Sequence, residues 1–178
     1  MISRAFVAVA PPPRVLDAID AHVRRCSFAG WRRSRREQWH LTLDFLGGVD
    51  NEVRVIDGLD VLGRGTAPFR LALGGAGAFP EPGKAKVVWL GVVDGARELG
   101  ALATVVRTAL RSSEARPFHP HVTLARSDRP RAAAPLVDAL DASPVGPSWE
   151  VDAVELVSSE THPSGARYTT VARLALSG

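Results

Sequence analysis

Two short motifs, one in each half of the chain, carry the residues best suited to acid–base chemistry. Segment 39–43 reads WHLTL and segment 120–124 reads PHVTL, so a His-x-Thr-Leu unit begins at His40 and again at His121. Side chains of a β-strand alternate between its two faces, which places each histidine beside its threonine and opposite the aliphatic residues. Each motif therefore predicts a strand with one polar, reactive face and one buried face.

Paired imidazoles and hydroxyls suit catalysis at a phosphate. If the two strands lie side by side, one imidazole can take a proton from water while the other protonates the departing oxygen. An imidazole pKa of about 6.5 lets one ring be neutral and the other charged near neutral pH, without a metal. The hydroxyls of Thr42 and Thr123 can donate to the non-bridging oxygens. Because the unit is repeated, we predict that both histidines and both threonines form one catalytic site.

The other histidines lack this context. His22, His119 and His162 are interpreted as surface or locally hydrogen-bonded residues. Metal binding is the rival chemistry, since His119 and His121 alternate along the chain. Pro120 interrupts that alternation, and the five residues after His121 include no His, Cys, Asp or Glu. We therefore expect neither a metal nor a cofactor.

Hydropathy patterning predicts the elements that must position these residues. Apolar alternation and β-branched content predict strands at 5–10, 39–46, 69–76, 86–93, 121–125, 149–158 and 168–176. Apolar residues at helical spacing predict helices at 13–25, 51–63, 96–111 and 132–140. Asp50 and Asp94 are the candidate caps of the second and third helices. We expect one domain spanning 1–178, with an α+β fold and mainly antiparallel sheet.

Composition limits the location and the partners of the protein. Apolar residues make up 46% of the chain, but no run approaches the roughly 18 residues that would span a bilayer, so no membrane partner is expected. Cys26 is the single cysteine, which excludes an internal disulfide and favours a reducing, cytoplasmic setting. We expect a monomer.

Arginine is concentrated just before the first motif. The net charge is +3, and six arginines lie within residues 24–36: Arg24, Arg25, Arg32, Arg33, Arg35 and Arg36. Such a cluster either attracts phosphates by charge and bidentate hydrogen bonding or forms an ordinary solvated surface. The sequence leaves both interpretations open.

Further segments resemble the RNA 2',3'-cyclic phosphodiesterase family, also called the 2'-5' RNA ligase family, of the two-histidine phosphoesterase superfamily. They are EQWHLTLDFLG at 37–47, GAFP at 77–80, VWLG at 88–91, FHPHVTLAR at 118–126, LVSS at 156–159 and GARY at 165–168. The resemblance covers nearly the whole chain. It implies two pseudo-symmetric α+β lobes with an active-site cleft between them.

The resemblance also implies an activity and a division of roles. The expected reaction is hydrolysis of a 2',3'-cyclic phosphate on RNA or a nucleotide to a 2'-phosphomonoester, with reversible 2'-5' ligation in the family. On matching positions, His40 is the acid that protonates the 3'-oxygen and His121 is the base that activates water. Arg126 matches a family arginine that holds the phosphate, although strict alternation turns it away from Thr123 unless the strand bulges.

Three other side chains near the motifs have open roles. Phe45 and Phe79 provide either a stacking surface for a base or core packing, and we include Phe45 among the candidate substrate-binding residues. Asp44 falls on the face of His40 by alternation, where it either repels phosphate or orients a neighbour.

Two alternative functions of the protein also remain: cleavage of 2'-5'-linked oligonucleotides or linear RNA ends, and non-catalytic RNA binding through the arginine cluster.

Overall fold

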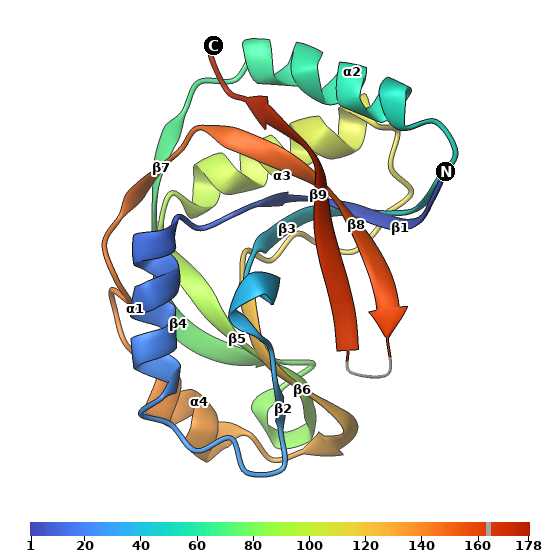
Figure 1. Ribbon diagram of the computed structural model, residues 1–178. Helices are drawn as coiled ribbons and strands as arrows, with labels where there is room; N and C mark the ends of the chain where they lie inside the picture. Colours follow the sequence, from blue (N-terminus) through green and yellow to red (C-terminus); the bar gives the residue numbers. More distant parts are fainter. Residues whose placement is uncertain (163–164) are drawn as a thin grey trace.

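The computed structural model describes residues 1–162 and 165–178, in which antiparallel strands form one strongly curled sheet (Figure 1). Within these residues the strand order is β7-β4-β5-β6-β3-β1-β8-β9, with β2 paired to β6. The strands are β1 (Ile2–Val9), β2 (Arg32–Arg33), β3 (Leu41–Val49), β4 (Phe69–Phe79), β5 (Ala85–Asp94), β6 (Val122–Arg131), β7 (Trp149–Val151), β8 (Ala153–His162) and β9 (Gly165–Ala175). The predicted α+β class with antiparallel sheet is confirmed.

In residues 1–162 and 165–178, four α-helices cover the sheet in two pairs. They are α1 (Pro13–Val23), α2 (Glu52–Arg64), α3 (Ala96–Ala109) and α4 (Ala134–Leu140). Helices α2 and α3 pack on the lobe of β1, β3, β8 and β9, whereas α1 and α4 lie on the lobe of β4, β5 and β6 (Figure 1). No helix in the described part of the chain has the length and apolarity needed to cross a membrane.

The two lobes meet where the two histidine motifs run side by side. Leu41 of β3 pairs with Val122 of β6, and both side chains are fully buried. These residues directly follow His40 and His121. The aliphatic faces of the motifs thus join the hydrophobic core, and the antiparallel pairing sets each histidine across the junction from the threonine of the other motif.

The helix caps differ from the predicted ones. Asn51, not Asp50, caps α2, because its side chain accepts a hydrogen bond from the backbone N–H of Arg54 at 3.1 Å. Helix α3 starts after Gly95, whose φ of 77° is left-handed and whose missing Cβ leaves room for the backbone of β4. Asp94 therefore ends β5 instead of capping the helix.

Candidate active site

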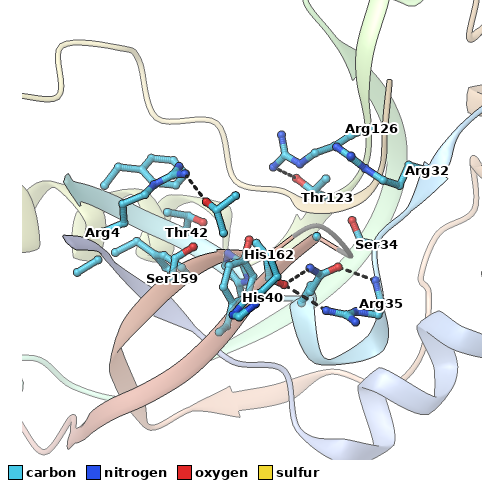
Figure 2. A pocket seen from close by; sticks show the side chains of 18 of the residues that line it. Arg4, Arg32, Ser34, Arg35, His40, Thr42, Thr123, Arg126, Ser159 and His162 are labelled. Atoms are coloured by element: carbon cyan, nitrogen blue, oxygen red, sulfur yellow. Dashed lines mark hydrogen bonds between the residues drawn. The ribbon is translucent and has the colours of Figure 1, made fainter. Parts of the chain in front are cut away.

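A cavity of about 750 Å³ lies between the lobes and contains both histidine–threonine pairs. Figure 2 shows His40, directly before β3, with Thr42 from β3 and Thr123 from β6 around this hollow. His121 lines it as well. The fold thus brings together all four residues that the motifs singled out. We call this cavity the cleft.

A β-bulge turns Arg126 toward the cleft. The register between β5 and β6 shifts by one residue after Thr123. The next two residues, Leu124 and Ala125, are therefore both buried, and Arg126 returns to the side of Thr123. Its guanidinium lies 3.5 Å from the Thr123 hydroxyl (Figure 2).

The first motif contains an equivalent bulge. The register between β1 and β3 shifts after Thr42, so Leu43 and Asp44 are both buried and Phe45 lines the cleft. Phe45 and Arg126 consequently occupy the same position of the two motifs. Because 54% of the Phe45 surface is accessible, its interpretation as a core residue is wrong.

The prediction that Asp44 faces His40 is also wrong. The bulge directs Asp44 into the interior, where only 1% of its surface is accessible. The Ser112 hydroxyl donates to its Oδ1 at 2.8 Å, and Nε of Arg107 lies 3.8 Å from the same oxygen. Burial raises the pKa of this carboxyl. Asp44 therefore orients the segment after α3 and does not contact a ligand in the cleft.

Backbone carbonyls orient both imidazoles. Nδ1 of His121 lies 2.7 Å from the carbonyl oxygen of His119, and His40 forms a backbone hydrogen bond to Gln38. Each acceptor is thus two residues before its histidine. A neutral ring that donates from Nδ1 leaves the lone pair of Nε2 free, which is the state required of a base.

Aromatic rings enclose the imidazoles. Phe6 stacks on His40 with ring centroids 4.6 Å apart, and Tyr168 meets the same imidazole edge-on at 5.3 Å. Phe79 meets His121 edge-on at 5.0 Å, so it supports a histidine and does not provide a free stacking surface. Sequence periodicity assigned no such role to Phe6, Tyr168 or Phe79.

Burial and positive charge lower the pKa of both imidazoles. Burial is the main cause for His40, whose pKa falls to about 4, with smaller contributions from the charges of Arg126 and His121. Burial likewise lowers the pKa of His121, and the charges of His119 and Arg126 add to the effect. The charge of Arg126, which lines the same cleft, thus contributes to the low pKa of both rings.

The cleft is strongly basic. None of its described lining residues is Asp or Glu, and six are arginines: Arg4, Arg32, Arg33, Arg35, Arg116 and Arg126. Arg32, Arg35 and Arg116 form ion pairs with carboxylates that do not line the cleft. Arg24 and Arg36 lie outside the cleft and form ion pairs with carboxylates of α1. Of the predicted arginine cluster, the cleft is lined by Arg32, Arg33 and Arg35, whose charges favour an anionic ligand.

The remaining histidines differ in their surroundings. His22 Nε2 lies 2.9 Å from the carbonyl oxygen of Leu140 in α4, so His22 is hydrogen-bonded, but to a residue far along the chain. His162 lines the cleft, which the sequence did not indicate, and its Nε2 lies 3.3 Å from a carboxylate oxygen of Glu160. Among residues 1–162 and 165–178, no group of three or more His, Cys, Asp or Glu is placed to hold a metal.

Comparisons with known proteins identify the family. A model of the 2'-5' RNA ligase superfamily matches residues 12–163. The chain belongs to this superfamily. The RNA 2',3'-cyclic phosphodiesterase of Thermus thermophilus is 35% identical, with 98% of this chain and 91% of that protein covered. The Escherichia coli K12 protein of the same name is 35% identical, with coverages of 97% and 96%.

Two solved structures share the fold of this chain. The Thermus thermophilus protein TT0787 superposes with a TM-score of 0.79 at 33% identity, covering 98% of both chains. Escherichia coli LigT complexed with 3'-AMP gives a TM-score of 0.76 at 28% identity, covering 100% of both. The family and the fold inferred from the motifs are therefore confirmed.

Proposed function

We propose that this protein hydrolyses a 2',3'-cyclic phosphate at the end of RNA or of a nucleotide to a 2'-phosphomonoester. The main support is that His40 and His121, from different lobes, line one cleft together with Thr42, Thr123 and Arg126. The lack of acidic residues among the described lining of the cleft favours a phosphate ligand. Membership of the RNA 2',3'-cyclic phosphodiesterase family agrees with this reaction.

Each step of the reaction has a residue suited to it. Nε2 of His121 takes a proton from water, and the water oxygen forms a bond to phosphorus. The bond from phosphorus to O3' breaks on the opposite side, and His40 gives its proton to O3'. Thr42 and Thr123 donate to the non-bridging oxygens, and Arg126 balances their charge. Exchange with solvent then restores both histidines. If a 5'-hydroxyl replaces water, the same steps form a 2'-5' linkage.

The low pKa of both imidazoles should make kcat/KM decrease as the pH rises above neutrality. Catalysis needs one ring charged and one neutral, but burial lowers the pKa of both rings in the free protein. The value of kcat/KM should therefore fall up to about tenfold between pH 7 and pH 8. A bound anionic phosphate favours the imidazolium, so the alkaline limb of kcat should lie at higher pH than that of kcat/KM.

Initial rates between about pH 5 and pH 9 measure both limbs. Replacing Arg126 with Gln should move the alkaline limb of kcat/KM upward, because the Arg126 charge lowers the pKa of both rings. A kcat/KM that is constant from about pH 6 to pH 8 in the wild type would contradict two imidazoles whose pKa is lowered.

The function itself is tested with 2',3'-cyclic AMP in the presence of EDTA. We expect turnover to a single product, adenosine 2'-phosphate, separated chromatographically from the 3'-phosphate. Absence of turnover by the folded protein, or formation of the 3'-phosphate alone, would reject the proposal. The same assay with 2'-5'-linked oligoadenylate and with linear RNA ends tests the alternative substrates.

A further inference from the structure

A second cavity of about 380 Å³ opens beside the cleft. It lies between the end of β3, the start of α2 and the turn that follows α3. Phe45, which is exposed, lines both this cavity and the cleft. A ligand that leaves the cleft over Phe45 therefore enters the second cavity directly.

Two arginines give the second cavity its charge. Arg54 comes from α2 and Arg111 from the turn after α3. In the part of the chain that the structure describes, neither guanidinium forms an ion pair or a hydrogen bond, whereas Arg64 of the same α2 is held by Asp60. Asp50 is the single carboxylate among the described lining residues. Two unpaired guanidinium groups favour an anion with several acceptor oxygens, as in a phosphodiester.

The turn that carries Arg111 is fixed in place. Arg111 has a φ of 52°, which is unfavourable for a residue other than glycine. The backbone N–H of Ser112 donates to the carbonyl of Arg107 at 2.9 Å, and its hydroxyl donates to buried Asp44. Asp44 lies on β3, the strand that follows His40. The hydrogen bond from Ser112 to Asp44 thus connects the turn that lines the second cavity with β3.

Phe45 offers a stacking surface between the two cavities. The guanidinium carbon of Arg116 lies 5.9 Å from the centre of its ring, and Phe6 lies beside it with centroids 6.2 Å apart. Exposed aromatic rings flanked by arginine bind bases of single-stranded nucleic acid with little sequence preference. A nucleotide chain would therefore find a phosphate site, a stacking surface and another phosphate site in succession.

We propose that the second cavity binds the phosphodiester of a neighbouring nucleotide when the cyclic-phosphate end of an RNA chain occupies the cleft. This inference rests on the proposed function and adds to it a second binding site, lined by Arg54 and Arg111. It makes an oligoribonucleotide a better substrate than a cyclic mononucleotide, because only the oligonucleotide has a phosphodiester for the second cavity.

The test compares kcat/KM for a 2',3'-cyclic mononucleotide and for a short oligoribonucleotide that ends in the same nucleotide and cyclic phosphate. The wild type should prefer the oligonucleotide. Arg54→Gln and Arg111→Asn should each lower that preference about tenfold, since each removes a charge-assisted contact. Asparagine is chosen at 111 because it tolerates a left-handed backbone. The salt dependence of oligonucleotide binding should become shallower, by about 0.7 in the log–log slope.

Arg97→Gln is the matched control, because Arg97 is exposed on α3 outside both cavities and the substitution removes the same charge. It should keep the wild-type preference. Equal loss on both substrates, or an unchanged preference in both cavity variants, would overturn the second site and leave the proposed reaction intact. If the folded wild type turns over neither substrate, the proposed function fails and the second site fails with it.

Discussion

Replacing His121 with alanine is expected to lower kcat by about 10²-fold to 10⁴-fold, the usual contribution of a positioned acid or base. The same loss is expected for His40→Ala. The imidazoles act in one step on opposite sides of phosphorus, so the double variant should lose much less than the product of the two single losses. Single-turnover rates on a 2',3'-cyclic nucleotide measure this directly.

His22→Gln is the control for these variants. His22 forms its hydrogen bond to Leu140, away from the cleft, and glutamine can retain a polar contact there. This variant should keep wild-type activity. A His121→Ala or His40→Ala protein that folds normally and retains more than about a tenth of the wild-type kcat would exclude that histidine from the acid–base step. Salt-sensitive RNA binding without any turnover would favour the non-catalytic alternative.

Removing the threonine hydroxyls is expected to have the next largest effect. Thr42→Val and Thr123→Val should each lower kcat/KM by about 10²-fold, because each removes a donor to the non-bridging oxygens. Valine keeps the shape and the β-branched character of threonine, so the strands should remain intact. Steady-state kinetics on the cyclic nucleotide give the loss.

Serine substitutions distinguish the hydroxyl from the methyl group. Thr42→Ser and Thr123→Ser keep the donor and should recover most of the activity that valine removes. Thr169→Val, an exposed position of β9 outside the cleft, should have no effect. If both cleft valine variants stay within a few-fold of the wild type, the hydroxyls do not contact the phosphate.

Local patterns predict the elements because the signals lie within each segment. Alternation located β3 and β6, and helical spacing located the four helices with ends shifted by a few residues. The predicted strand 149–158 is divided at Asp152 into β7 and β8, and two-residue β2 is too short for periodicity to detect. The repeated motif located the catalytic candidates because it needs no knowledge of neighbouring strands.

Features that depend on strand pairing were not predictable in the same way. The bulge after Thr42 is a register shift of β3 against β1, and the bulge after Thr123 is a register shift of β6 against β5. Strict alternation within a single strand contains no such shift, so it places Phe45 and Arg126 on the wrong face. The resemblance to the family supplied Arg126, whereas alternation did not. Asp44 was placed on the wrong face for the same reason.

Side chains that come from distant segments were missed as well. Phe6 and Tyr168 lie on β1 and β9, far from His40 in the sequence, yet they enclose its imidazole. Their positions follow from the sheet order, in which β1 and β8 join β3 to β9. A single sequence has no local pattern that identifies such contacts, so the low pKa of His40 could not be anticipated either.

The most direct test of two imidazoles acting on opposite sides of one phosphorus is the stereochemistry of the reaction. A 2',3'-cyclic phosphorothioate of one configuration would be hydrolysed in ¹⁸O-labelled water, and the configuration of the chiral 2'-thiophosphate determined by ³¹P NMR. Inversion is predicted, because water enters opposite the departing 3'-oxygen in a single displacement. Retention would contradict the account, since it requires two displacements through an intermediate attached to the protein.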